Sequence, residues 1–447
     1  MTARDLSPAL SKLRRANRAF QQAYPGEPGS DQPVHVFYGG AHLFRADTSP
    51  RLGALALAAL DEYAPDVATF GTAFGLGELA GIVRERVVAR LRRQPVEDYR
   101  IDFEDGYGYR SDAEEDGHAR SAAEEVAKGF AAGTLPAGIG LRIKPMSNEA
   151  HARSLRTLDL FISTLARAAR KRLPSRLAVT IPKVTAPEHV TAVAHVCASL
   201  ERRLGLQKGA LRIEIMIETP QSVIAADGSV ALRALVAAGG SRVTSAHFGT
   251  YDYTALSGVT AAWQHMRHPV CDTARHLMQA ALAQTGVHLS DGGTNVMPVA
   301  VHRDEGTRPL SARERQENRD AVHRAWKVHF DDISHSLMSG FYQGWDLHPA
   351  QLPSRYAAVY AFYLSSRDAA TRRLRAFVDK AAQATLVGEV FDDAATGQGL
   401  LNFFVRGLQA GALTIDEAAE TGLTRDELTS RSFVAIVDAR TRGQRRR

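Results

Sequence analysis

Glu104 and Asp105 stand side by side, directly after an apolar run that ends at Phe103. Adjacent carboxylates raise each other's pKa, and this repulsion costs stability unless solvent or a cation offsets it. For a single acidic pair, a solvated turn is the ordinary explanation, because charged residues are mostly exposed. The rest of the chain favours chemistry instead, since other strand-like runs also end in charged or polar side chains.

The side chains at the other run ends are Arg142, Lys183, Glu218, Asp252 and His348. Carboxylates combined with one or two cations make a site of hard oxygen ligands, which suits Mg²⁺, with Mn²⁺ as an alternative. Glu218 and Asp252 are the natural ligand pair, because they follow successive runs. Arg142 can bind a substrate carboxylate through two hydrogen bonds. Lys183 can support the carboxylates or the substrate.

Each of these residues also has an ordinary structural explanation. Glu218 and Asp252 can stabilise helix N-termini. Arg142 can pair with a structural acid, and Lys183 can lie on the surface. His348 can be a buried histidine whose hydrogen bonds are satisfied. Their shared position favours a site, because several polar groups at one end of a fold are costly to bury unless they bind something.

Short β-branched runs alternate with long helical patterns, which is typical of a parallel sheet built from βαβ units. The eight runs are VHVFY (34–38), YRIDF (99–103), IGLRI (139–143), LAVTIP (177–182), LRIEIMI (211–217), RVTSAHF (242–248), a run near VMPVAV (296–301) and FYQGWDL (341–347). Eight strands predict a (β/α)₈ TIM barrel, whose active site lies at the carboxyl ends of the strands. A doubly wound sheet is the alternative, but GGAHLF lacks the glycine spacing of a phosphate-binding turn.

The same pattern predicts three regions along the chain. Residues 1–33 form an N-terminal helix and a linker, 34–352 form the barrel, and 353–447 form a helical extension or lid. In the last region the strand signal disappears, and TIDEAAETGLTRDEL carries two helix starts.

Composition excludes several classes of protein. The 447 residues are 45% hydrophobic and 23% charged, with a net charge of +6. The basic run at 167–176 and the basic C-terminus are not interleaved with aromatics, so nucleic-acid binding is not expected. Only two cysteines occur, which argues against a disulfide framework or a thiolate metal site. No membrane span or signal peptide is predicted, and a cytoplasmic location is expected.

The chain resembles the citrate lyase β-subunit, malyl-CoA lyase and malate synthase superfamily. The resemblance covers residues 34–352 and rests on FEDG, LRIKP, IPKV, IMIETPQSV, HFGTYDYT and GFYQGWDLHPAQL in that order. It implies a Mg²⁺-dependent TIM barrel that acts on 2-oxo and 2-hydroxy acids, and a homo-oligomer. It implies metal ligands at Glu218 and Asp252; catalytic roles at Glu104, Asp105, Arg142 and Lys183; and substrate contacts at Arg142, Gly249, Thr250, Tyr251 and His348.

The chain departs from this resemblance in two ways. Tyr251 precedes the second metal aspartate, where lyase members usually carry Glu, so the motif is closer to the Trp-Asp-Tyr of malate synthases. The catalytic acid or base of the superfamily often comes from a C-terminal lid, sometimes that of a neighbouring subunit. Asp392, Asp393 and Asp416 are the candidates for it here.

Three functions therefore stay open. The first is a Mg²⁺-dependent carbon–carbon lyase, aldolase or condensing enzyme that works through an enolate stabilised by metal and arginine. The second is a malate synthase-like acyltransferase that condenses glyoxylate with an acyl-CoA. The third is a non-catalytic subunit that binds an oxo acid. The expected partner is a small oxo or hydroxy acid, with a coenzyme A thioester where the chemistry requires one.

Overall fold

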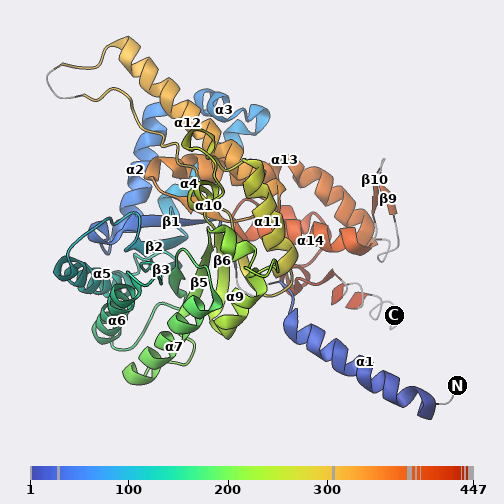
Figure 1. Cartoon of the computed structure of the whole chain (residues 1–447). Helices are drawn as coiled ribbons and strands as arrows, with labels where there is room; N and C mark the ends of the chain where they lie inside the picture. Colours follow the sequence, from blue (N-terminus) through green and yellow to red (C-terminus); the bar gives the residue numbers. More distant parts are fainter. Residues whose placement is uncertain are drawn as a thin grey trace. The chain divides into compact units, whose positions relative to one another are not determined.

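The computed structural model in Figure 1 describes residues 3–27, 31–304, 308–379, 385–387, 390–392, 394–433, 435–436 and 439–440. The chain divides into two compact units. The first unit comprises Met1–Arg51, Val96–Asn295 and Phe341–Leu347, and the second comprises Leu52–Pro95, Val296–Gly340 and His348–Arg447. Each unit is therefore assembled from segments that are far apart in the sequence.

In the described part of the chain, eight strands of the first unit form one parallel sheet in the order β7-β6-β5-β4-β3-β2-β1-β8. The strands are β1 (His35–Gly40), β2 (Asp98–Asp102), β3 (Gly138–Arg142), β4 (Leu177–Ile181), β5 (Arg212–Ile217), β6 (Val243–Phe248), β7 (His288–Ser290) and β8 (Gly344–Asp346). The predicted TIM barrel is confirmed.

The ring closes through the residues that follow β7. The amide of Asp291 donates to the carbonyl of Gln343 at 2.8 Å, and the amide of Trp345 donates to the carbonyl of Gly292 at 2.9 Å. Gly293 and Trp345 form a parallel bridge. The last strand is thereby joined on both sides, to β1 and to this segment.

The seventh strand was predicted near 296–301, and this prediction is wrong. The strand lies earlier, at His288–Ser290, and residues 296–301 carry no strand. VMPVAV is apolar, but Pro298 has no amide hydrogen and cannot donate to a sheet ladder. The other seven predicted strands are confirmed, and no end differs by more than three residues.

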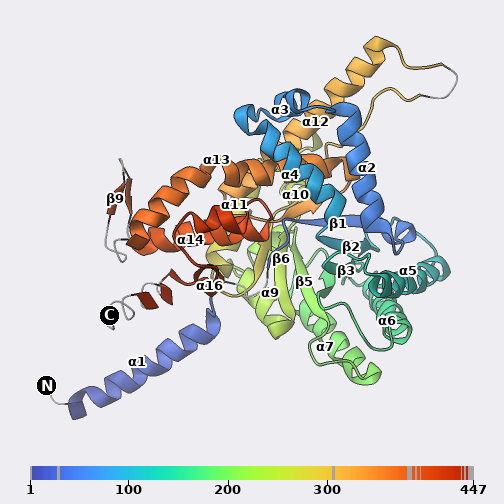
Figure 2. The same cartoon turned by 180° about the vertical axis from the view of Figure 1, so that it is seen from behind.

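The outward-facing side chains of the strands form the apolar core of the first unit. Tyr99, Ile101 and Phe103 alternate with charged residues along and just beyond β2, and all three are buried. The helices of this unit are α1 (Ala3–Ala23), α5 (Asp112–Ala132), α6 (His151–Ala168), α7 (Pro187–Leu204), α8 (Pro220–Val223), α9 (Leu232–Ala238), α10 (Thr250–Leu256) and α11 (Pro269–Leu282). Helices α5, α6 and α7 cover the outside of the strands (Figure 1, Figure 2), and each large apolar side chain buried there contributes about 1.5–3 kcal/mol.

The interior of the barrel is unusually polar. Arg100 on β2 binds Glu214 on β5, two strands that are not neighbours in the sheet, so the contact crosses the interior. His247 Nε2 lies 2.8 Å from Glu214 Oε2. Barrel interiors are more often filled by Val, Ile and Leu. The charges in this interior are buried in mutual contact, which is the condition under which such groups are tolerated.

The second unit is helical. Its elements are α3 (Val67–Phe74), the 3-10 turn η2 (Gly77–Leu79), α4 (Ala80–Arg93), α12 (Ala312–Met338), the 3-10 turn η5 (Pro349–Gln351), α13 (Leu352–Asp379), β9 (Thr385–Val387), β10 (Val390–Asp392), α14 (Ala394–Gln409), α15 (Ile415–Ala419) and α16 (Arg425–Ser430), with α2 (Thr48–Tyr63) entering it at Leu52. Trp326 and Phe74 belong to its aromatic core, with their ring centroids 5.6 Å apart. Figure 2 shows α13 and α14 side by side. None of the described helices is long and apolar enough to cross a membrane.

Candidate active site

The sequence predicts functional side chains at the ends of six strand-like runs. The structure brings those of five runs together at the carboxyl ends of neighbouring strands. Glu104 and Asp105 follow β2, and Arg142 is the last residue of β3. Lys183 follows β4, Glu218 follows β5 directly, and Asp252 lies in the first turn of α10, after β6. All of them belong to the first unit.

Lys183 is the centre of the cluster. Its Nζ forms an ion pair with Glu104 Oε1 and lies 3.2 Å from Asp105 Oδ1 and 3.7 Å from Asp252 Oδ2. Its backbone amide donates to Glu218 Oε1 at 2.6 Å. The residue adopts a φ of 48°, which is uncommon for a residue other than glycine. Such strain clusters at functional sites and persists where the surroundings hold it in place.

Arg142 forms the second cationic centre. Its Nε donates to Asp102 Oδ1 at 2.7 Å, and its Nη2 binds the other oxygen of the same carboxylate. Its Nη1 lies 3.1 Å from Glu104 Oε2, and the guanidinium sits 4.9 Å from the centre of the Tyr38 ring. One edge of Arg142 is thus paired with a buried structural acid, while Nη1 faces the carboxylate cluster.

Negative charge outweighs positive charge in this cluster. Among the described residues, five carboxylates, on Asp102, Glu104, Asp105, Glu218 and Asp252, surround the two cations of Arg142 and Lys183. The imbalance predicts that some carboxylates of the cluster hold protons more tightly than usual unless a further cation is present.

The pKa values of Glu218, Glu104 and Asp252 follow this imbalance. Burial would raise the pKa of Asp105, but the hydrogen bond with Glu104 and the charges of Arg142 and Lys183 outweigh it and lower this pKa instead. Burial, together with the charge of Asp252, raises the pKa of Glu218 to about 8. Burial also raises the pKa of Glu104 to about 7, against the opposing charge of Arg142. Burial raises the pKa of Asp252 as well. Burial would lower the pKa of Lys183, but Glu104 and the other carboxylates raise it, so the side chain stays protonated and cannot act as a base near neutrality.

This electrostatic imbalance predicts a pH-dependent stability when divalent cations are removed. The folded chain holds a proton on Glu218 up to about pH 8, whereas a carboxyl with the ordinary glutamate pKa of 4.5 releases it far earlier. The free energy of unfolding in EDTA should therefore fall as pH rises from 5 to 8, by about 1 kcal/mol per pH unit at the steepest point. Urea unfolding at pH 5, 6, 7 and 8 measures it. A free energy that rises between pH 6 and 8 would contradict the expected charge excess.

The residues of the HFGTYDYT motif shape the turn that carries Asp252. A Cβ on Gly249 would come within 2.6 Å of Glu218 Oε2, so any other residue there would displace the carboxylate. Thr250 is buried, with its hydroxyl 3.0 Å from Met266 Sδ. The Tyr251 hydroxyl accepts from the amide of Asn295 at 2.8 Å. These contacts fix the first turn of α10.

The remaining candidates lie in the second unit. His348 is the N-cap of η5, and its Nδ1 accepts from the amide of Ala350 at 3.2 Å. Asp416 is exposed in the first turn of α15. Asp393 lies outside the described residues, and so does the side chain of Asp392. His348 therefore caps a 3-10 turn, and Asp416 lies at the N-terminal end of a helix.

Sequence reasoning missed the buried partners of the site. Asp102 binds Arg142, yet it lies inside the run YRIDF, which was interpreted as an apolar strand. Arg100 and Glu214 were missed for the same reason. A signal was available, because Asp98, Arg100 and Asp102 alternate along β2 and must share one face of the strand.

Mg²⁺ fits the chemistry of these donors. Within the described ranges no group of three or more His, Cys, Asp or Glu side chains could hold a metal ion. Mg²⁺ usually takes only one or two protein carboxylates and completes its coordination with water and substrate oxygens. The cluster offers carboxylate oxygens and lacks the thiolate or imidazole ligands that zinc prefers. A bound cation would offset the excess of negative charge in the cluster.

Comparison with known proteins gives one family assignment. Residues 13–436 match the model of the family described as domain of unknown function DUF6986, and the chain belongs to this family. A search of curated proteins found no match.

Solved structures share the fold at low sequence identity. A citrate lyase from Burkholderia xenovorans LB400 is 18% identical, with a TM-score of 0.56 over 88% of this chain and 97% of that chain. CitE from Mycobacterium tuberculosis, in complex with magnesium, acetoacetate and coenzyme A, is 15% identical over 86% and 99%, with a TM-score of 0.47. A magnesium/glyoxylate complex of malate synthase from Haloferax volcanii is 15% identical over 91% and 96%, with a TM-score of 0.44. The last two scores are too low to bear on this chain, and the first confirms the predicted resemblance for the fold alone.

Proposed function

We propose that the chain is a Mg²⁺-dependent carbon–carbon lyase or condensing enzyme that acts on 2-oxo or hydroxy acids through an enolate. The observation that carries this proposal is the excess of carboxylates beside Arg142 at the carboxyl ends of the barrel strands. Active sites of TIM barrels are built at this end. The shared fold with a structure described as a citrate lyase supports the same class of chemistry.

Glu218 and Asp252 are the proposed metal ligands. They offer oxygen donors from consecutive strand ends, and their pKa values are raised, as expected for acids that lack a compensating cation. When bound, Mg²⁺ polarises a 2-oxo group and stabilises the negative charge of an enolate.

The two protein cations have different proposed roles. Arg142 is held rigidly by Asp102, which leaves Nη1 to bind a substrate carboxylate in place of Glu104. Lys183 stays protonated and pairs with both Glu104 and Asp105, which keeps these carboxylates in position. A preorganised cation that meets developing negative charge is a large source of rate enhancement.

An acyltransferase of malate synthase type is the second candidate. The observation that favours it is Tyr251 beside Asp252, in the position where lyase relatives usually carry Glu. In that reaction the enolate comes from an acyl-CoA, attacks glyoxylate, and the thioester of the adduct is then hydrolysed.

Two assays on the full-length protein with MgCl₂ separate the candidates. Incubation with glyoxylate and acetyl-CoA should leave free thiol at background if the enzyme is a lyase, whereas Mg²⁺-dependent thiol release would favour the transferase. A panel of 2- and 3-hydroxy acids should release pyruvate or glyoxylate, and EDTA should abolish this release. No turnover in either assay, together with retained binding of an oxo acid, would overturn the proposed activity in favour of a binding subunit.

A further inference from the structure

Tyr38 on β1 crosses the interior of the barrel. Its register partner on β2 is Arg100, whose side chain reaches Glu214 across the interior, so both side chains point inward. The Tyr38 hydroxyl lies 3.4 Å from Glu214 Oε1 on β5, and its ring centroid lies 4.8 Å from that of Trp345 on β8. Tyr38 is buried, and all four residues belong to the first unit. Burial and the contact with Trp345 hold the ring in place.

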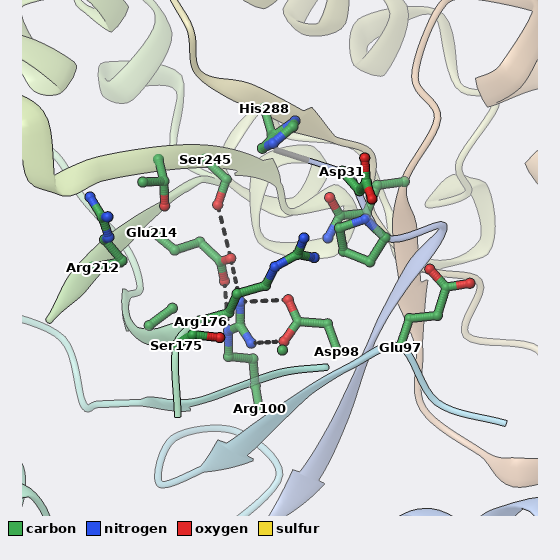
Figure 3. A pocket seen from close by; sticks show the side chains of 15 residues that line it. Asp31, Glu97, Asp98, Arg100, Ser175, Arg176, Arg212, Glu214, Ser245 and His288 are labelled. Carbon is green, nitrogen blue, oxygen red and sulfur yellow. Dashed lines mark hydrogen bonds and ion pairs between the residues drawn. The ribbon is translucent and has the colours of Figure 1, made fainter. Parts of the chain in front are cut away.

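The acid that Tyr38 contacts has stronger partners of its own. Glu214 Oε2 accepts from Arg100 Nη2 at 2.8 Å and from Ser245 Oγ at 2.9 Å. Its Oε1 accepts from Thr180 Oγ1 at 2.7 Å. Figure 3 shows Glu214 in the cavity at the amino ends of the strands, with dashed lines to Arg100 and Ser245. The bond from Tyr38 is longer than each of these, so Glu214 does not depend on it, and the main contact of Tyr38 lies on the face of its ring.

The face of the Tyr38 ring meets the guanidinium of Arg142, whose central carbon lies 4.9 Å from the ring centroid. Arg142 also shares two hydrogen bonds with Asp102 along one edge of the guanidinium. Bonds along one edge restrain the group less against tilting about that edge. The ring opposes this tilt, because a cation is attracted to an aromatic face, and more strongly where both groups are buried, as they are here. Nη1 is thereby kept 3.1 Å from Glu104 Oε2.

A neutral ring suits this position beside Arg142. Burial and the charge of Glu214 raise the pKa of Tyr38 well above its ordinary value, so the ring stays uncharged. A carboxylate in its place would add to the negative charge of the cluster and would compete with a substrate for the guanidinium. The ring holds the cation without occupying any of its N–H donors.

We infer that Tyr38 is a positioning residue: its ring fixes the tilt of the Arg142 guanidinium and so directs Nη1 at the substrate carboxylate. The substrate part of this inference rests on the proposed function, whereas the contact between ring and guanidinium does not. Because the N–H groups of a guanidinium lie in its plane, the substrate carboxylate meets Nη1 in that plane, in the place that Glu104 Oε2 takes in this structure.

Nuclear magnetic resonance on the full-length protein with ¹⁵N-labelled arginine tests the contact without any substrate. The Nε–H resonance of Arg142 is assigned by its absence in Arg142→Lys. Tyr38→Leu and Tyr38→Met, which remove the ring, should shift this resonance and accelerate its hydrogen exchange by about tenfold or more. Tyr38→Phe keeps the ring and should leave both unchanged. Methionine adapts to irregular gaps, so the second ringless variant covers a failure of the first to fold. An unchanged resonance and exchange rate in a folded ringless variant would overturn the inference.

Isothermal titration calorimetry with glyoxylate, and in parallel with pyruvate, in MgCl₂ tests the part that concerns the substrate. The ringless variants should bind the oxo acid about three- to thirtyfold more weakly than the native protein, and Tyr38→Phe should bind it as the native protein does. Tyr99→Leu is the matched control, because Tyr99 is also buried but faces the outer core, where its ring centroid lies 5.8 Å from that of Phe37. This control should lose stability and keep its affinity.

The two measurements fail in different ways. Equal affinity in the native protein and a ringless variant would refute the role of Tyr38 in substrate binding. Absence of binding of both oxo acids by the native protein would count against the proposed function, and with it against the substrate part of this inference. The Arg142 resonance decides in either case whether the Tyr38 ring positions the guanidinium.

Discussion

Replacing Glu218 by Gln, or Asp252 by Asn, is expected to lower metal-dependent turnover by a factor on the order of 100 or more. Loss of a residue that only orients a metal ligand already costs 10–100-fold in many sites, and loss of a ligand itself should cost at least as much. The fold should remain, because the amide of Gln can still accept the hydrogen bond that Glu218 Oε1 receives from the Lys183 amide.

Thermal unfolding with and without MgCl₂ separates metal binding from folding in these variants. The native protein should gain melting temperature with Mg²⁺, since a ligand that binds only the folded state stabilises it. Each variant should lose this gain while its melting temperature in EDTA stays near the native value. Asp227→Asn, at an exposed carboxylate, is the matched control and should behave as the native protein does. Unchanged turnover in either variant would remove that residue from the proposed ligand set.

The Arg142→Lys substitution should both destabilise the protein and weaken substrate binding. Lysine cannot reproduce the paired hydrogen bonds that Arg142 makes to Asp102, so a buried carboxylate loses partners. The free energy of unfolding should fall by about 1–3 kcal/mol. The KM should rise at least tenfold, because Nη1 no longer holds the proposed substrate carboxylate beside Glu104.

Urea unfolding and steady-state kinetics on the same preparation distinguish two roles for Arg142. A lower stability with an unchanged KM would mean that the residue serves only as the structural partner of Asp102. A raised KM at assay conditions where the variant remains folded would support direct substrate binding. Arg172→Lys, at an exposed arginine, should change neither quantity.

The grouping of Glu104, Arg142, Lys183 and Glu218 could be predicted from the sequence because strand direction alone places them together. In a parallel barrel every strand delivers its last residues to the same end, so only the strand ends must be identified. The partners could not be predicted in the same way. Asp102 pairs with Arg142 because the two residues are register partners on β2 and β3. Register depends on the packing of the whole sheet, which one sequence does not reveal.

The region of the barrel around β7 and β8 was the hardest to predict. β7 has only three residues, too few to show a periodic pattern, and the longer apolar run near 296–301 was mistaken for it. His348 follows β8 in sequence just as the other candidates follow their strands. The structure shows it as the N-cap of η5, two residues after β8, and its substrate contact stays a prediction.

The division of the first unit into three separated segments has a consequence for synthesis. β8 at Gly344–Asp346 pairs with β1 at His35–Gly40, so the ring cannot close until nearly all of the barrel sequence has left the ribosome. Until then the nascent chain carries β1 with one unpaired edge, and such edges recruit other chains. Contacts over so long a separation also form slowly. The order of the segments therefore prolongs the exposure of this strand edge during translation.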